Sequence, residues 1–320
     1  MGKKPHILIL LGPTASGKTA ASVLLAKKLN AEIISADSIQ VYKGLDIGSA
    51  KPTMEERQGI EHHLIDVADV DDTSFSVAEY KRQAEFAIAD IRSRGKTPLV
   101  VGGTGLYVNA LTYPLQFTNV PGDPLVRERL QLEEREHPGS LYRRLQLEDP
   151  ASAARLHPND RKRVVRALEV LEVSGRPLSS FGADFENKAR QEIDYHVAQI
   201  GLTMERVLLY QRIEQRVDDM MRSGLLEETK KLHEAGYAHT LPALQGLGYK
   251  QLLRHLRGET ALEEAVEEIK RETRRFAKRQ VTWFKRDQRI RWLDVTQYRD
   301  LDTLTDEMAA IYMGDEGETV

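Results

Sequence analysis

Eight residues near the start of the chain have the types and the spacing that bind phosphate. Gly12-Pro13-Thr14-Ala15-Ser16-Gly17-Lys18-Thr19 matches the pattern G-x-x-x-x-G-K-[ST]. The glycines let the backbone curl so that successive N–H groups face an anion, and a following helix adds its positive end. Lys18 supplies a mobile cation, and Thr19 supplies a hydroxyl group for Mg²⁺. The motif predicts binding of a diphosphate or triphosphate, as in ATP-binding proteins, and leaves kinases, NTPases and transferases that release diphosphate open.

A lone carboxylate, Asp37, ends the second predicted strand of the chain. Open α/β sheets place their ligand crevice at the carboxyl ends of their strands, so Asp37 is expected to face the phosphate-binding loop. There it is suited to bind Mg²⁺ through water or to accept a proton from a nucleophile. The alternative is a turn cap, which Asp forms routinely at strand ends.

The turn at residues 102–105, Gly-Gly-Thr-Gly, follows the third predicted strand and therefore lies at the same crevice. Thr104 is a candidate hydrogen-bond donor to a ligand, although a tight strand-to-helix connection explains the glycines equally well. The pair His62-His63 suggests a metal site, but neighbouring strand residues point to opposite faces, which favours structural roles.

Basic residues gather near the end of the chain, between Arg271 and Arg291, where only Glu272 and Asp287 oppose them. At helical spacing most of them, including Arg275 and Lys278, fall on one side, and the apolar residues with Gln280 fall on the other. A one-sided basic stripe indicates a polyanion as partner. A solvated helix whose acids come from other elements is the alternative.

Two smaller groups of cations are also candidates. Arg161, Lys162 and Arg163 begin a helix behind Asp160, where cations oppose the helix dipole, so they point to phosphates or to an acidic neighbour. Arg212 and Arg216 share a helix face. They would reach a diphosphate or pair with nearby acids, and the spacing does not say which of the two would face a ligand.

These residues need a scaffold of alternating strands and helices. Strands are predicted at residues 6–11, 32–37, 97–101, 192–202 and 289–295, with helices after the first two. Residues 123–175 show helical periodicity and no strand. We therefore predict an α/β fold with a P-loop NTPase-like parallel sheet, formed by residues 1–114 and 191–313 and interrupted by a helical domain at 115–190. Further helices are expected at 204–222, 224–235 and 259–288, followed by a frayed tail at 314–320.

Composition limits the class of protein. Among 320 residues, 41% are hydrophobic and 30% charged, which indicates a globular chain rather than a disordered one. No apolar run approaches the ~18 residues of a membrane span, so no membrane is expected as a partner. The absence of cysteine excludes disulfides and thiolate chemistry and favours the cytoplasm. The net charge of −3 does not by itself predict nucleic acid, so charge must be judged locally. We expect a monomer.

Taken together, these motifs make the chain resemble the tRNA dimethylallyltransferase family, also called tRNA isopentenyltransferases, in its bacterial form. The resemblance covers nearly the whole chain. It is carried by GPTASGKT at 12–19, SADSIQVYKGLDIGSAKP at 35–52, HHLID at 62–66, VGGTGLY at 101–107, NDRKRVVRALEV at 159–170, QGLGYKQ at 245–251 and TRRFAKRQVTWFK at 273–285.

The resemblance implies a role for each matching position. Residues 14–19 would hold the diphosphate of dimethylallyl diphosphate, with Lys18 on the phosphates and Thr19 near Mg²⁺. Asp37 would be the general base, and Thr104 would lie beside the transferred group. Contacts to tRNA are implied for Asp37, Ser38, Ile39, Gln40, Thr104, Arg127, Arg161, Lys162, Arg163, Val164, Val165, Gln245, Gly248 and Lys250, and the basic stripe adds Arg275 and Lys278.

The expected reaction is transfer of a dimethylallyl group to the exocyclic N6 amine of an adenosine in the anticodon stem-loop of tRNA, with release of diphosphate. Three alternatives stay open: a transferase that uses free adenine nucleotides, a small-molecule kinase, and an RNA-binding module without catalysis. The long basic helix argues against the first. Pyrophosphate release without ATP consumption would exclude the second, and turnover would exclude the third.

Overall fold

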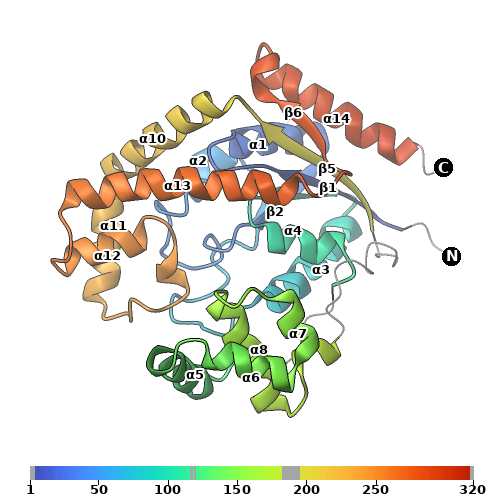
Figure 1. Ribbon diagram of the computed structural model, residues 1–320. Coiled ribbons are helices and arrows are strands. Elements are labelled where there is room, and N and C mark those ends of the chain that lie inside the picture. Colours follow the sequence, from blue (N-terminus) through green and yellow to red (C-terminus); the bar gives the residue numbers. More distant parts are fainter. Residues whose placement is uncertain (1–3, 116–117, 119, 182–194, 318–320) are drawn as a thin grey trace. The chain divides into compact units, whose positions relative to one another are not determined.

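The computed structural model describes residues 4–115, 118, 120–181 and 195–317 (Figure 1). The chain divides into two compact units. One, here called the core unit, comprises residues 1–75, 79–112 and 193–320, and the other, the helical unit, comprises residues 76–78 and 113–192. In the described part of the chain no helix is long and apolar enough to cross a membrane.

The core unit is built on a parallel sheet of six strands, which confirms the predicted α/β class. Along the sheet the order is β3-β2-β4-β1-β5-β6. The interior strands are continuous runs of buried residues, as expected where helices cover both faces. The strands are β1 (His6–Leu11), β2 (Ala31–Ala36), β3 (His62–His63), β4 (Thr97–Gly102), β5 (His196–Thr203) and β6 (Arg291–Asp294).

The register of the sheet brings three loops together. Gly102 at the end of β4 lies opposite Leu11 at the end of β1 and opposite Ala36 at the end of β2. The loops that follow these three strands are the phosphate-binding loop, the Asp37 segment and the Gly-Gly-Thr-Gly turn. They therefore leave the sheet at one edge, as the carboxyl-end rule predicts.

One face of the sheet packs against α1 (Lys18–Lys28) and α14 (Leu301–Gly317). Leu10 and Ile200 of the sheet share a buried cluster with Leu25 of α1 and Met308 of α14. The opposite side of the sheet carries α3 (Val77–Ser93) and α4 (Gly105–Thr112) (Figure 1). The prediction of a frayed end from residue 314 was wrong for 314–317, which complete α14, whereas 318–320 lie outside the described residues.

Most of the remaining helices of the core unit lie between β5 and β6 in the sequence. The predicted helices at 204–222, 224–235 and 259–288 are confirmed with shorter bounds, whereas α12 and α14 were not predicted. They are α10 (Arg206–Arg222), α11 (Leu225–Glu234), α12 (Tyr249–Leu256) and α13 (Leu262–Phe284), with α2 (Met54–Arg57) and the 3-10 turns η2 (Ala243–Gln245) and η3 (Val295–Gln297) completing the unit.

The helical unit has its own apolar centre. Leu130, Leu145 and Leu168 are fully buried in it. Asp123, Asp149 and Asp160 cap three of its helices by accepting hydrogen bonds from backbone N–H groups of the first turn. Its described elements are α5 (Pro124–Glu136), α6 (Ser140–Glu148), α7 (Pro150–Arg155), α8 (Arg161–Ser174) and the 3-10 turn η1 (Leu178–Phe181).

Candidate active site

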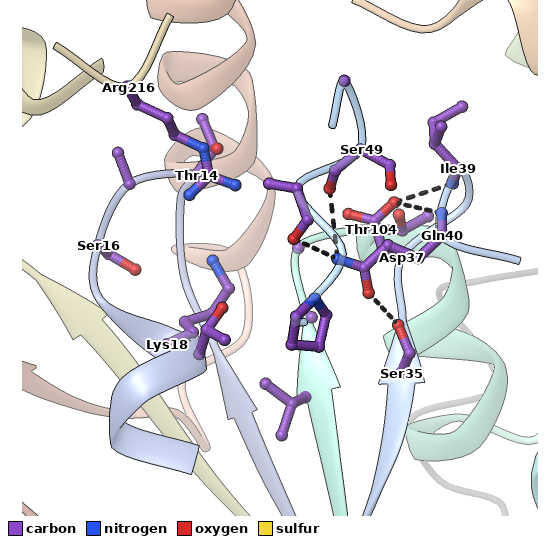
Figure 2. Close-up of a pocket in the computed structure, with 18 of the residues that line it drawn as sticks. Thr14, Ser16, Lys18, Ser35, Asp37, Ile39, Gln40, Ser49, Thr104 and Arg216 are labelled. Carbon is purple, nitrogen blue, oxygen red and sulfur yellow. Dashed lines mark hydrogen bonds between the residues drawn. The ribbon is translucent and has the colours of Figure 1, made fainter. Parts of the chain in front are cut away.

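The loops at the carboxyl edge of the sheet enclose a cavity of about 720 Å³ (Figure 2). A cavity of this size suits a small organic ligand. One side is the phosphate-binding loop, the other side is the Asp37 segment with the loop at residues 48–50, and α10, α13 and residues 245–250 complete the walls.

The phosphate-binding loop has the backbone that an anion cradle requires. Gly17, at the start of α1, has φ 93°, and Ala15 has φ 63°, a conformation that costs a non-glycine residue energy. A side chain at Gly12 would place Cβ 2.7 Å from the backbone oxygen of Leu202, so only glycine fits there. The buried hydroxyl group of Ser16 has no hydrogen-bond partner among the described residues. This unpaired group and the strained loop are what a site awaiting an anion would contain.

Lys18 lies at the bottom of this cradle. Its Nζ donates hydrogen bonds to the backbone oxygens of Gly12 and Pro13, at 3.0 and 2.7 Å. Burial, together with the charge of the nearby Arg216, lowers the pKa of Lys18 to about 7, while the charge of Asp37 opposes the shift. A bound diphosphate would offset both effects, because its negative charge favours the protonated form of Lys18.

Asp37 caps a turn and also faces the cavity, so the turn cap is present and leaves a role toward a ligand open. Its Oδ1 accepts hydrogen bonds from the backbone N–H groups of Ile39, at 2.8 Å, and Gln40, at 3.3 Å. Its Oδ2 accepts none from the described residues. The side chain is only partly buried and lines the cavity across from Lys18 (Figure 2). One oxygen therefore fixes the carboxylate, and the other is available to a ligand.

Thr104 connects the turn after β4 to the Asp37 segment by hydrogen bonds. Its Oγ1 accepts a hydrogen bond from the Ser38 N–H at 3.0 Å, and its own N–H donates to Ala36 at 3.1 Å. A Cβ at Gly102 would lie 2.2 Å from that same Ala36 oxygen, so the close approach of the strands explains this glycine. Thr104 lines the cavity, where its hydroxyl position is set by Ser38.

The structure distinguishes the two arginines that the sequence could not separate. Arg216 points into the cavity near Lys18 (Figure 2). Arg212, one turn earlier on α10, is exposed and does not line the cavity. Burial lowers the pKa of Arg216, and the charges of Asp37 and Glu56 partly offset this effect. Arg216 is therefore the candidate for contact with a diphosphate.

Gln280 of α13 is a site residue that the sequence had placed on an inward face without assigning it a function. Its Oε1 accepts a hydrogen bond from Thr14 N–H at 2.9 Å, and its Nε2 donates to the Gly103 oxygen at 2.9 Å. It thus joins the phosphate-binding loop to the turn after β4. The available indication was a polar residue within the otherwise apolar inner stripe of this helix.

The basic stripe on α13 is less one-sided than predicted. Arg274 forms an ion pair with Glu214 of α10 at 2.5 Å, and Arg275 pairs with Glu272 at 2.7 Å. Arg279 lines the cavity instead of pointing only to solvent. Lys278 is exposed. The alternative in which other elements supply acids is therefore correct for Arg274.

In the helical unit, the predicted contact residues fall into two groups. Arg127, Arg161 and Arg163 are half-exposed or exposed, and each lies within ion-pair distance of an acid of the same unit. Lys162 is exposed. Val164 and Val165 are buried in the apolar centre of the unit, with 2% and 5% of their surface exposed. Their side chains are therefore unable to contact a tRNA in this conformation.

The other predicted residues lie in the core unit. Ile39, Gln40, Gln245, Gly248 and Lys250 all line the cavity. The two histidines have structural partners. The Nδ1 of His62 lies 2.9 Å from the Ile60 oxygen, and the Nε2 of His63 lies 2.8 Å from Glu32 Oε2.

Comparison with known proteins identifies the family. The sequence model of the family described as IPP transferase matches residues 40–287. The tRNA dimethylallyltransferase of Pelotomaculum thermopropionicum is 47% identical, over 96% of this chain and 96% of that protein. The tRNA dimethylallyltransferase of Bacillus subtilis is 46% identical, over 93% of this chain and 94% of that protein.

Solved structures agree with the sequence comparison. The crystal structure of the full-length tRNA isopentenylpyrophosphate transferase from Bacillus halodurans is similar with a TM-score of 0.73 and 42% identity, over 99% of this chain and 98% of that one. A eukaryotic dimethylallyltransferase acting on tRNA is similar with a TM-score of 0.78 and 32% identity, over 95% of this chain and 77% of that one. The chain belongs to the IPP transferase family and is one of its enzymes.

Proposed function

We propose that this enzyme transfers the dimethylallyl group of dimethylallyl diphosphate to the exocyclic N6 amine of an anticodon-loop adenosine in tRNA and releases diphosphate. The observation that carries the proposal is the cavity itself, in which a phosphate cradle and a partly free carboxylate face each other. Family membership supplies the substrates: the relatives are named for dimethylallyl transfer and for tRNA.

In this reaction the adenine nitrogen attacks the allylic carbon and the bond between that carbon and the diphosphate oxygen breaks. The electron pair of the broken bond leaves with the diphosphate. Lys18, Arg216 and the N–H groups of the phosphate-binding loop would stabilise the charge that grows on this leaving group. An aromatic amine is a weak nucleophile, so removal of its proton by Asp37 as the new bond forms would lower the barrier.

We propose that a divalent cation binds together with the diphosphate, since the Thr19 side chain lines the cavity beside the cradle. With Mg²⁺ held at the Thr19 hydroxyl, charge on the diphosphate would be partly neutralised. Among the described residues no three His, Cys, Asp or Glu side chains converge as a metal site. We therefore propose that the substrate oxygens, and not a set of protein carboxylates, supply most ligands of the ion.

The adenine must leave its stack to enter a cavity of this kind. Ile39, Gln40 and residues 245–250 line the cavity on the side of Asp37, and we propose that they contact the extruded base and its neighbours. The exposed cations Lys278 and Lys162 are proposed to bind the phosphates of the tRNA arm. We further propose that the enzyme acts as a monomer in the cytoplasm, which light scattering and fractionation would test.

The test is transfer itself. Incubation of the protein with an unmodified tRNA transcript, Mg²⁺ and labelled dimethylallyl diphosphate is expected to place the label on one adenosine, identified by nucleoside analysis. Asp37→Asn should retain tRNA binding and lower the single-turnover transfer rate by ~10²–10⁴. Weakened tRNA binding with an unchanged rate of chemistry would contradict the role of Asp37 as base, and no label on tRNA would refute the proposed function.

A further inference from the structure

Glu228 of α11 binds the backbone of a loop far away in the sequence. Its two carboxylate oxygens accept hydrogen bonds from three successive N–H groups, those of Asp46, Ile47 and Gly48, at distances between 2.9 and 3.2 Å. Successive N–H groups that converge in this way form an anion-binding concavity. Here the anion is a side chain of the protein itself.

A buried tyrosine completes this arrangement. The hydroxyl group of Tyr249 donates a hydrogen bond to Glu228 Oε1 at 2.7 Å, and the ring is fully buried. Burial, with the adjacent charge of Glu228, raises the pKa of Tyr249, so its hydroxyl stays protonated. A Cβ at Gly48 would lie 2.5 Å from the tyrosine ring, so the loop and the ring fit together only with glycine at this position.

The loop held by Glu228 continues directly into the active site. The backbone oxygens of Ser49 and Ala50 accept hydrogen bonds from Gln40 Nε2, at 3.3 and 3.2 Å (Figure 2). The Gln40 Oε1 accepts one from the Ser35 hydroxyl at 2.9 Å. The backbone N–H of Gln40 donates to Asp37 Oδ1. Hydrogen bonds, joined by short stretches of backbone and by the Gln40 side chain, therefore connect Glu228 to the candidate base.

Glu228 does not line the cavity, so it would not contact a ligand bound there. Packing supports the same connection, because a Cβ at Gly246 would lie 3.3 Å from both the Ile39 side chain and the Tyr249 ring. Residues on α11, in the segment 246–249 and in the loop 46–50 thus pack together behind the residues that line the Asp37 side of the cavity.

We propose that Glu228 is a positioning residue for the transfer reaction, which holds the loop 46–50 so that Gln40 and Asp37 are oriented toward the adenine. The inference rests on the proposed function, because it assigns that wall to the base of tRNA. The proposed role differs from a general role in stability. Loss of Glu228 would lower the rate of the chemical step on tRNA and leave pyrophosphate binding at the phosphate cradle intact.

The chain offers a matched control in the preceding residue. Glu227 and Glu228 both lie in the first turn of α11, but Glu227 is exposed. Glu227→Gln and Glu228→Gln remove the same charge from the same helix end, where acids favour the dipole equally. Any difference between the two variants therefore comes from the contacts of Glu228 with the loop and with Tyr249.

The first measurement is the single-turnover transfer rate at saturating tRNA and dimethylallyl diphosphate, together with the Kd of inorganic pyrophosphate. Glu228→Gln is expected to lower the rate about tenfold, because a misplaced catalytic group loses rate steeply. It should leave the pyrophosphate Kd within about twofold of wild type, as should Glu227→Gln, since exposed substitutions have small effects.

The second measurement is hydrogen exchange at residues 46–48, followed by mass spectrometry. Glu228→Gln should accelerate exchange there about tenfold, because charge-assisted hydrogen bonds are lost, while Glu227→Gln should not. If Glu228→Gln does not fold, Tyr249→Phe carries the test, with an expected loss of transfer rate of about threefold from one hydrogen bond.

Equal transfer rates in the Glu228 and Glu227 variants would overturn the inference. So would a parallel loss of transfer and pyrophosphate affinity, because that pattern indicates general damage. Failure of the wild-type protein to transfer would instead refute the proposed function, and it would appear without any substitution.

Discussion

Replacement of Arg216 by glutamine should weaken the binding of diphosphate while leaving the ligand-free protein folded. Arg216 points into the cavity beside Lys18, and both cations face the position of the expected anion. Without a ligand they repel each other, since Arg216 is one of the causes that lower the pKa of Lys18. The substitution therefore removes an unfavourable contact from the empty site and a favourable one from the occupied site.

The magnitude follows from the charge of the group and its partial burial. Two unit charges at ~4 Å and an effective dielectric constant of ~20 attract by about 4 kcal/mol. The net contribution of a hydrogen bond to a charged group is smaller, about 1.5–3 kcal/mol, and this net value is the relevant one. Every ~1.4 kcal/mol is tenfold in affinity, so the Kd of pyrophosphate should rise by about 10- to 100-fold. Arg216→Lys should fall between wild type and Arg216→Gln, because it keeps the charge and loses the planar fork.

Isothermal titration with pyrophosphate and Mg²⁺ measures this effect, and Arg212→Gln is its control. Arg212 lies one turn earlier on the same helix and is exposed, so its loss should change the Kd by less than about twofold. The assignment of Arg216 to the diphosphate would be refuted by equal effects of the two substitutions, or by an unchanged Kd in Arg216→Gln with lost tRNA binding.

Three further predictions concern other parts of the core unit. Glu32 is 3% exposed and its pKa is held well below the ordinary value of 4.5, chiefly by Arg94, so its stabilisation is present above about pH 4.5 and is lost as the pH falls below it. In urea unfolding, Glu32→Gln should therefore have a lower free energy of unfolding than wild type at pH 7, and this free energy should fall less as the pH is lowered. The same pH dependence in both proteins would contradict this. Gln280→Leu leaves the Thr14 N–H and the Gly103 oxygen unpaired. It should lower the free energy of unfolding by about 1–3 kcal/mol and raise the KM for dimethylallyl diphosphate. If both values stay at their wild-type levels, the two hydrogen bonds of Gln280 are dispensable. Thr19→Val keeps the shape of the side chain and removes its hydroxyl, so the Mg²⁺ concentration for half-maximal transfer should rise by about tenfold, and an unchanged Mg²⁺ titration would exclude Thr19 as a ligand.

The position of the site was predictable because it depends on short-range patterns. The phosphate-binding loop, Asp37 and Thr104 each follow a buried strand, and the ends of parallel strands meet at one edge of the sheet. The α/β class and the helical insertion follow from the alternation of strand and helix periodicity and from its change after residue 114. These inferences need no knowledge of how distant segments pack.

The parts that were not predicted depend on contacts between distant residues. Gln280 meets Thr14 across 266 positions of the chain, and Glu228 meets Gly48 across 180. Whether Arg212 or Arg216 enters the cavity depends on the rotation of α10 relative to the sheet, which periodicity within α10 does not determine. The missed helix α14 is different, because Leu304, Met308 and Tyr312 are spaced by four residues and already indicated a buried face.

The two alternatives for Asp37, turn cap and general base, turn out to be compatible because a carboxylate has two oxygens. Oδ1 accepts the N–H groups of Ile39 and Gln40, which fixes the orientation of the side chain before any substrate arrives. Oδ2 is then held in place without a bond of its own among the described residues. A base that is already oriented loses little freedom when it accepts a proton, so the hydrogen bonds that define the turn also favour the reaction. By the same reasoning, Gln40 and the loop held by Glu228 would contribute to the rate without touching the reacting atoms. A cap at a strand end is therefore an argument for a catalytic role when the capped turn borders a phosphate-binding loop.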